Sequence, residues 1–347
     1  MERVCVTGAG GYIASWVIKL LLAKGYIVHG TVRDPCNEEK NGHLKKLENA
    51  EERLHLFKAD LFDNEGLRTA FSGCSGVLHI ASPVPGTLQF DDPQTEILDP
   101  AIVGTRNVLN ACLELKVKKV VFVSSMVSAM LNPKWPQGLE MDESSWADVD
   151  YCKTNERWYA LSKTVAEREA LEYAKKGLNV VTICPSGTIG PMLQPTVNAS
   201  SLLLLSYIKD LEGRSDGTKK TEDAERAVVD VRDVAKAIVL LYEKQESEGR
   251  YICSSYSLMT REFVAKVQSI FPDYDYPQNF TEPKITERAL FNTKKLLNLG
   301  WNYRPLEETI VDSIKNYEEA GLLNTDGIPT RAHPPYCLGY KLQRICG

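Results

Sequence analysis

The chain has 347 residues, a formal net charge of −5 and a hydrophobic content of 43%. This length allows one large domain or two ordinary ones, and the composition is typical of a soluble globular protein. The acidic balance disfavours a nucleic-acid partner, which would need a basic face. No apolar run approaches the ~18 residues of a membrane span, and the first residues form a strand pattern rather than a signal peptide. We therefore expect a cytoplasmic protein with no membrane partner. Its nine cysteines lack metal-type spacing, so no metal site is expected.

Strand and helix patterns alternate through the first half of the chain. Short apolar runs predict strands at 4–7, 27–32, 54–59, 77–80, 119–124 and 180–184. Helical spacing of apolar residues predicts helices at 12–24, 43–49, 64–71, 95–115 and 156–175. This alternation predicts an α/β fold of the Rossmann type, in which helices cover both faces of a doubly wound parallel sheet. Ligands of such sheets bind at the carboxyl ends of the strands.

The second half is less regular. Helices are predicted at 233–242, 261–270 and 306–319, among turn-rich stretches. We expect residues 1–185 to form an NADP-binding Rossmann domain. Residues 186–324 are expected to form a smaller C-terminal substrate-binding lobe, some of whose elements return to the first domain. Residues 325–347 contain three prolines and little periodicity, and they are expected to form a tail.

A glycine-rich turn joins the first strand to the first helix. Gly8, Gly10 and Gly11 permit a tight turn and a close approach of the backbone to a pyrophosphate. The N-terminus of the following helix offers N–H groups and the positive end of its dipole. A strand before the turn and a helix after it favour a dinucleotide site over a merely tight turn. Tyr12 and Ile13 begin the helix and are expected to contribute to that site.

The residues after the second strand favour NADPH/NADP+ over NAD. Arg33 stands where NAD enzymes often carry an acidic residue for the ribose hydroxyls, and its planar fork of donors suits a 2′-phosphate. Lys40 adds a second positive charge nearby. Two alternatives stay open: Asp34 could face the ribose, or Arg33 and Asp34 could form a solvated surface pair. Asp60 and Leu61 follow the third strand and are expected beside the adenine.

A tyrosine and a lysine lie four residues apart in the helix predicted at 156–175. Tyr159 and Lys163 therefore share one helix face, where the ammonium can stand beside the phenol. A nearby cation favours the phenolate, which makes a tyrosine a better proton donor and acceptor near neutral pH. Ser125 ends the fifth predicted strand, and its hydroxyl could bind a substrate oxygen as negative charge develops there. An incidental Tyr and Lys on a surface helix is the alternative.

These residues together resemble the extended short-chain dehydrogenase/reductase family, across roughly residues 3–319. Within it, the chain is similar to the plant cinnamoyl-CoA reductase and dihydroflavonol reductase group. The phrases that carry the resemblance are Val6-Thr7-Gly8-Ala9-Gly10-Gly11, Thr31-Val32-Arg33-Asp34-Pro35, His79-Ile80-Ala81-Ser82-Pro83, Gly104-Thr105-Arg106-Asn107-Val108, Val123-Ser124-Ser125 and Asp230-Val231-Arg232-Asp233-Val234.

The resemblance implies a catalytic triad of Ser125, Tyr159 and Lys163. It also implies NADP contacts from Arg33, Lys40, Asp60 and Leu61, and further ones from Ile80, Ala81, Ser82, Pro185, Thr188 and Ser200. For Asn107 it leaves two alternatives, holding an active-site water chain or packing near the start of a helix.

Departures from the resembled group bear on the substrate. Cinnamoyl-CoA reductases carry a His and a Lys after Gln-Pro-Thr-x-Asn-Ala-Ser and use them with an Arg to hold CoA. Here Leu203 and Ser206 stand at about those positions, which leaves Arg250. The group's Asn-Trp-Tyr-Cys-Tyr-Gly-Lys signature here has Ala160 after the tyrosine, so Cys152 lacks the thiol partner that some relatives have. The altered CoA segment favours a free aldehyde or ketone over a CoA thioester.

The predicted function is NADPH-dependent reduction of an aldehyde or ketone to an alcohol, on an aromatic substrate of the hydroxycinnamaldehyde type, as in cinnamyl alcohol dehydrogenase-like members. Met126, Leu193, Leu203 and Tyr207 are candidates for the pocket wall, with plain core packing as the alternative for each. Reduction of a CoA thioester or of a dihydroflavonol-type ketone is the alternative function. A non-catalytic NADP-binding sensor is disfavoured because it needs no proton donor. The expected partner is a small-molecule substrate, and the expected state is a monomer or homodimer.

Overall fold

A parallel sheet forms the centre of the structure, a computed structural model that describes residues 1–82, 90–136, 138–208, 220–282 and 290–323. Its strand order is β10-β6-β5-β4-β1-β2-β3. The strands are β1 (Arg3–Thr7), β2 (Ile27–Val32), β3 (Leu54–Lys58), β4 (Gly76–His79), β5 (Lys119–Val123), β6 (Val180–Pro185) and β10 (Gly249–Cys253). The order reverses between β1 and β4, which is the switch point of a doubly wound sheet. The predicted fold class is confirmed.

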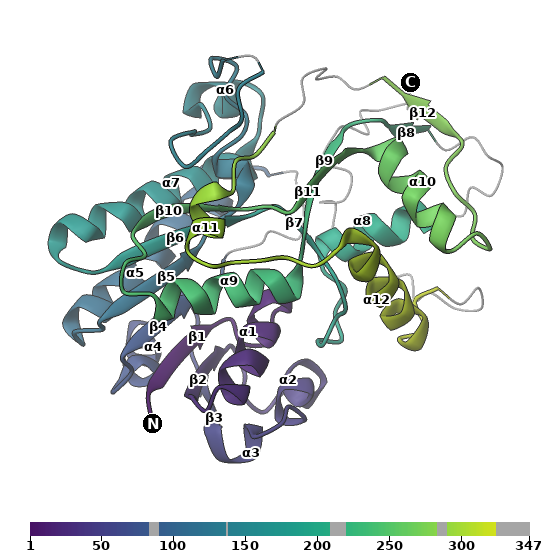
Figure 1. The fold of residues 1–347 in the computed structure, drawn as a ribbon. Coiled ribbons are helices and arrows are strands. Elements are labelled where there is room, and N and C mark those ends of the chain that lie inside the picture. The colour runs from purple at the N-terminus through teal and green to yellow at the C-terminus, as the bar shows by residue number, and fades with distance from the viewer. Residues whose placement is uncertain (83–89, 137, 209–219, 283–289, 324–347) are drawn as a thin grey trace.

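Helices cover both faces of this sheet (Figure 1). On one face lie α1 (Tyr12–Ala23), α2 (Glu38–Lys45) and α9 (Val231–Glu243); on the other lie α4 (Asn64–Phe71), α5 (Asp99–Glu114) and α7 (Trp158–Glu172). Successive side chains of a strand point to opposite faces, so Val4 and Val6 join one core while Cys5 joins the other. Because both faces are covered, β4, β5 and β6 are buried along their whole length. The edge strand β3 instead exposes His55 and Lys58.

Two of the helix predictions are wrong in their bounds. The helix predicted at 43–49 instead spans Glu38–Lys45, because Asn37 caps it by accepting the Lys40 N–H at 2.9 Å. A second short helix, α3 (Ala50–Arg53), follows it. The pattern at 95–115 divides into a π-helical turn, η1 (Gln94–Leu98), and α5, whose first turn contains a proline. Proline suits that position because it has no N–H to donate.

A second body follows β6. Its sheet has the order β11-β9-β7, from β7 (Gly187–Ile189), β9 (Glu225–Asp230) and β11 (Tyr256–Met259). The helices α8 (Ala199–Ile208), α10 (Thr260–Ile270) and α12 (Leu306–Glu319) share an apolar core with it and lie to one side of the main sheet (Figure 1). Not all residues after 186 belong here, because α9 packs on α1 and β10 pairs with β6.

The remaining elements are short. They are η2 (Met126–Ser128), α6 (Val149–Thr154), η3 (Tyr173–Lys176), β8 (Lys220–Glu222), β12 (Asn279–Thr281) and α11 (Lys294–Asn298). Over the described part of the chain, no helix is both long and apolar enough to cross a membrane. The predicted tail, 325–347, lies outside the described residues.

Candidate active site

The glycine turn between β1 and α1 is too closely packed to accept side chains at its glycines. Gly8 has a φ of +67°, which favours glycine, and a Cβ placed on it would lie 3.1 Å from the Cα of Ala81. A Cβ on Gly10 would lie 3.1 Å from Oδ1 of Asn41. Gly11 caps α1 without a side-chain hydrogen bond, and the first turn of the helix holds no acidic residue. The positive end of the helix dipole is therefore left for an anion, and the turn fits a dinucleotide pyrophosphate.

Two polar side chains end the strands that flank the switch point. Oγ1 of Thr7 accepts the N–H groups of Ile80 (3.1 Å) and Ala81 (3.0 Å), and it lies 2.8 Å from Nδ1 of His79. A hydroxyl has two acceptor sites and one proton, so Thr7 donates to Nδ1 and His79 carries its proton on Nε2. Burial, with a smaller effect of Lys163, lowers the pKa of His79 to about 3. The ring is therefore neutral at physiological pH.

The predicted 2′-phosphate residues lie at the surface beyond β2. Arg33 and Lys40 are both exposed, on the loop after β2 and on α2. Asp34 uses its carboxylate within this loop, where Oδ1 accepts the N–H of Cys36 at 3.0 Å. No ion pair between Arg33 and Asp34 is found among the described residues, so the geometry gives no support to a surface pair of these two.

Hydrogen bonds made by Asp60 and Asn107 stabilise the loop after β3. Oδ1 of Asp60 accepts the backbone N–H groups of Phe62 (2.7 Å) and Asp63 (3.1 Å). Nδ2 of Asn107 donates to the carbonyl oxygen of Leu61 at 2.9 Å. Asn107 therefore fastens this loop to α5, which favours the packing role over the water-chain alternative.

The other predicted cofactor residues divide by exposure. Tyr12 is buried and its hydroxyl donates to the carbonyl oxygen of Gly190 at 2.9 Å, so its side chain joins α1 to the second body. Pro185 and Thr188 are buried at the end of β6 and in β7. The partly exposed residues are Ile13, Ile80, Ala81, Ser82, Ser200 and Leu61.

The three predicted catalytic residues lie in adjoining elements. Ser125 follows β5 and caps η2, and α7 carries Tyr159 and Lys163 one turn apart. Helix α7 packs against η2, and Tyr159 shares an apolar cluster with Val127. Lys163 also lines a small pocket with His79, at the carboxyl end of β4. The fold therefore brings the triad to the same edge of the sheet as the glycine turn.

Lys163 is buried at this edge, with an exposed fraction of 7%. Burial penalises its charged form and lowers the pKa of Lys163 from 10.5 to about 8, although the carboxylate of Glu167 opposes the shift. The side chain is therefore mostly an ammonium at pH 7, and it loses its proton as the pH rises through about 8.

A buried ion pair lies beneath the triad. Nε of Arg250 stands 2.7 Å from Oε1 of Glu167, and the guanidinium stacks 3.7 Å above the ring of Trp146. Arg250 is 4% exposed and Glu167 fully buried. The expectation that Arg250 remains available to CoA is wrong, because its charge is enclosed and neutralised. Glu167, Thr7 and His79 were not among the predicted site residues, although polar residues ending two apolar strands were a usable signal for the last two.

The predicted pocket-wall residues also divide. Met126, Leu193 and Leu203 are partly exposed, in η2, after β7 and in α8. Tyr207 is only 4% exposed, and its ring lies 6.2 Å edge-on from that of Phe263 in the core of the second body. Of the two alternatives for Tyr207, this position favours core packing, because the ring lies between α8 and α10.

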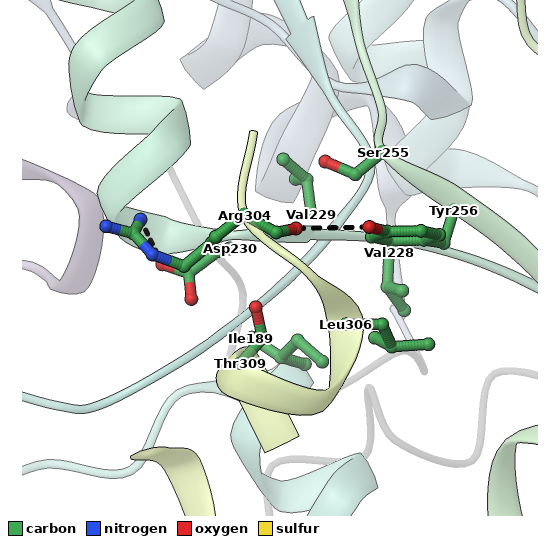
Figure 2. A pocket seen from close by; sticks show the side chains of 9 residues that line it. All are labelled: Ile189, Val228, Val229, Asp230, Ser255, Tyr256, Arg304, Leu306 and Thr309. Carbon is green, nitrogen blue, oxygen red and sulfur yellow. Dashed lines mark hydrogen bonds and ion pairs between the residues drawn. The ribbon is translucent and has the colours of Figure 1, made fainter. Parts of the chain in front are cut away.

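A crevice in the second body is too narrow to be the site. Figure 2 shows Asp230 and Arg304 on one side and Tyr256 on the other, with the Tyr256 hydroxyl donating to the carbonyl oxygen of Arg304 at 3.2 Å. The crevice leaves no room for a water molecule. Its remaining lining residues are Ile189, Val228, Val229, Ser255, Leu306 and Thr309. Among the described residues, no cluster of histidine, cysteine and carboxylate side chains suits a metal ion.

The sequence matches a known protein family and known plant reductases. Residues 4–253 match the NAD dependent epimerase/dehydratase family. The chain is 44% identical to cinnamoyl-CoA reductase 1 of Petunia hybrida over 96% of each chain. It is 39% identical to tetraketide alpha-pyrone reductase 1 of Arabidopsis thaliana, covering 93% of this chain and 97% of that one.

Solved structures show the same fold. Vestitone reductase from alfalfa has a TM-score of 0.78 at 30% identity, covering 92% of this chain and 99% of that chain. Gre2 of Candida albicans, solved as a complex with NADPH, has a TM-score of 0.77 at 27% identity with the same coverage. The predicted resemblance to plant reductases is confirmed, and the chain belongs to the NAD dependent epimerase/dehydratase family.

Proposed function

We propose that this protein is an NADPH-dependent reductase that converts the carbonyl group of a small molecule into an alcohol. One observation carries the proposal: Tyr159 and the buried Lys163 lie one turn apart on α7, beside the strand end that carries Ser125 and at the sheet edge that carries the glycine turn. A proton donor, a cation beside it and a dinucleotide cradle are what carbonyl reduction requires.

Each residue has a role that follows from its position. The glycine turn and the start of α1 hold the pyrophosphate, while Arg33 and Lys40 hold the 2′-phosphate. Bound NADPH supplies the hydride. The Ser125 hydroxyl donates a hydrogen bond to the carbonyl oxygen, and Tyr159 delivers the proton to that oxygen. Lys163 holds the nicotinamide ribose, and its ammonium favours proton release from the neighbouring phenol.

For the substrate we propose an aromatic aldehyde or ketone of the hydroxycinnamaldehyde type. Leu203 and Ser206 offer no positive charge to CoA phosphates, and the Arg250 guanidinium is enclosed with Glu167. Met126 and Leu193 are partly exposed apolar candidates for the wall around the ring. We further propose that the enzyme acts in the cytoplasm as a monomer or homodimer.

Reduction of a CoA thioester is the second candidate function. The observation in its favour is the 44% identity to a cinnamoyl-CoA reductase over almost the whole of both chains. The two candidate functions differ in whether they need positively charged side chains near the substrate. CoA carries several phosphate charges, whereas an aldehyde carries none.

A single assay of NADPH consumption separates them. Coniferaldehyde, feruloyl-CoA and a dihydroflavonol are offered separately to the purified full chain. We expect the highest kcat/KM with coniferaldehyde. Turnover of feruloyl-CoA alone would reverse the ranking, and turnover of the dihydroflavonol alone would move the substrate to cyclic ketones. Lack of turnover with all three, in a protein that binds NADPH, would contradict the proposed substrate class.

A further inference from the structure

A buried carboxylate lies one helical turn beyond Lys163 on α7. Glu167 is fully buried, and both of its oxygens accept hydrogen bonds. The donors are Oγ of Ser124 at 2.7 Å, Oγ of Ser128 at 2.5 Å, Oγ1 of Thr182 at 2.7 Å, Sγ of Cys184 at 3.2 Å and Nε of Arg250 at 2.7 Å. A buried carboxylate with this many donors is held in one position.

The donors come from separate elements that meet under the active site. Ser124 follows β5, Ser128 ends η2, Thr182 lies in β6 and Arg250 lies in β10. Two of them flank Ser125 in the sequence: Ser124 is its neighbour, and the backbone N–H of Ser128 donates to the carbonyl oxygen of Ser125 at 3.0 Å. The carboxylate of Glu167 therefore ties the loop that carries Ser125 to the helix that carries Tyr159 and Lys163.

The network requires an ionised carboxylate. Burial acts to raise the pKa of Glu167, but Arg250 and the hydroxyls of Ser128 and Ser124 outweigh it and hold this pKa below its ordinary value. The Arg250 guanidinium is fixed in turn by the ring of Trp146 and by a hydrogen bond to the carbonyl oxygen of Ser145. Charge and geometry agree on a permanent Glu167–Arg250 ion pair.

We propose that Glu167 is a positioning residue for the reduction: through Ser124 and Ser128 it sets where Ser125 stands relative to Tyr159, and its charge maintains the ammonium of Lys163. This inference rests on the proposed function. Glu167 does not touch the substrate or the cofactor in this scheme, and it acts through Ser125 and Lys163.

The charged groups around Lys163 determine the pH at which it loses its proton. Tyr159 and Glu167 lie on its own helix, His79 faces it from β4, and Cys184 lies on β6. Arg250, from β10, lies behind Glu167. His79 is neutral because its pKa is about 3, and burial keeps the Cys184 thiol protonated by raising its pKa. Glu167 thus carries the negative charge that counters the burial of Lys163. Without that charge, the pKa of Lys163 falls further, and the ammonium is lost at a lower pH.

The test replaces Glu167 with its neutral isostere, Glu167→Gln, in the full chain. We expect kcat to fall by about tenfold or more while KM for the aldehyde changes little, because orientation and not binding is lost. We expect the alkaline limb of the pH profile to move to lower pH by about one unit. A carbon-13 NMR titration of the lysine ε-carbons reads the same shift without turnover, and Lys163→Met assigns the signal. The matched control is Glu169→Gln on the same helix, whose carboxylate pairs at 2.9 Å with the exposed Arg106 and whose loss should change neither quantity.

The outcomes separate this inference from the proposed function. A folded Glu167→Gln variant with unchanged kcat and unchanged pH limb would overturn the inference. If that variant does not fold, Ser124→Ala removes one donor beside Ser125 and keeps the ion pair, and kcat unaffected by this change would overturn the inference as well. If Glu167→Gln shifts the Lys163 signal but the unmodified protein reduces no carbonyl compound, only the proposed function is contradicted. An unshifted signal and limb in an active enzyme would contradict only the role of Glu167.

Discussion

Burial sets the chemistry of Lys163 and also its effect on stability. A pKa lowered from 10.5 to about 8 corresponds to about 3 kcal/mol against the charged form in the folded protein. Below pH 8 both folded and unfolded chains carry the charge, so the folded protein bears this penalty in full. Between pH 8 and 10.5 the folded protein releases its proton first, and the penalty fades as the pH rises.

Lys163→Met should therefore stabilise the fold while abolishing activity. We expect the free energy of unfolding to rise by about 2–3 kcal/mol near pH 7, with the gain mostly lost near pH 10. Urea denaturation at the two pH values measures it. Lys45→Met, at an exposed lysine paired with Glu38, is the control and should show no such pH dependence. A Lys163→Met variant less stable than the parent near pH 7 would contradict the assigned burial penalty.

The hydroxyl of Tyr159 is the proton donor in the proposed reaction. Tyr159→Phe keeps the ring and removes the proton, so kcat should fall by about 100-fold or more while NADPH affinity stays within about twofold. Stopped-flow turnover and fluorescence titration with NADPH measure the two. Tyr173→Phe is the control, since its hydroxyl only donates to Asn110 at 2.8 Å. Near-normal turnover in Tyr159→Phe would assign proton delivery to another group.

The choice between NADPH and NADH should depend on Arg33. A lost charge-assisted contact to a 2′-phosphate weakens binding by about 10-fold to 100-fold, so Arg33→Ala should raise the Kd of NADPH by that factor and leave NADH unchanged. Asp34→Asn tests the alternative, because the amide oxygen can still accept the Cys36 N–H. If Asp34→Asn selectively weakens NADH, then Asp34 contacts the ribose. Equal losses of both cofactors in Arg33→Ala would contradict the 2′-phosphate assignment.

The β1–α1 turn can be tested as an element with two glycine substitutions. Gly8→Ala combines a φ of +67° with a new Cβ 3.1 Å from Ala81, whereas Gly177→Ala has a φ of +88° and open space. Both should lose about 1 kcal/mol of stability from backbone strain. Only Gly8→Ala should also lose NADPH affinity, because the turn must shift to make room. Equal NADPH affinities in the two variants would show that the turn does not approach the cofactor.

The elements that the sequence predicted well are those with long, regular apolar patterns. Residues 64–71 and 306–319 match α4 and α12 in the structure, and the six predicted strands are all present. The helix predicted at 43–49 was wrong because a capping asparagine and a polar first turn, not apolar spacing, decide where α2 begins. Strands β7 and β11 are three and four residues long, and their partners lie far away in sequence, so no local pattern reveals them.

Across the whole molecule, the sequence could place candidate residues at strand ends and on helix faces, but it could not predict buried contacts between residues that are distant in the chain. Ser125, Tyr159 and Lys163 follow from strand ends and helical spacing. The pairing of Glu167 with Arg250 joins residues 83 positions apart. They meet only because β10, which carries Arg250, pairs in parallel with β6, and α7, which carries Glu167, packs on β6. For a related reason the sequence could not choose between pocket wall and core for Tyr207, since the pattern of an aromatic residue on a helix is the same in both cases.

The two bodies are fastened by charges at the start of α9. Nη1 of Arg304 stands 2.6 Å from Oδ1 of Asp233, whose side chain is 1% exposed, and 3.5 Å from Asp230 (Figure 2 shows the second pair). Nε of Arg304 reaches Glu308 on α12 at 2.9 Å. Arg304 therefore links a helix of the main sheet to a helix of the second body, and its removal leaves a buried carboxylate without its closest cation.

Arg304→Met should lower the free energy of unfolding by about 3 kcal/mol near pH 7, since the buried carboxylate of Asp233 loses its closest cation and keeps only Lys236, at 3.5 Å. Arg68→Met is the control, because the exposed pair of Arg68 with Glu114 at 2.6 Å should contribute nothing measurable. Burial already raises the pKa of Asp233, and losing Arg304 raises it further. A raised carboxyl pKa destabilises above the unfolded pKa and ceases to do so below it, so the deficit should shrink as the pH falls toward about 4. Asp233→Asn added to Arg304→Met should recover part of the lost stability near pH 7. If neither lower pH nor this second substitution restores stability, then Arg304 acts through packing and not through charge.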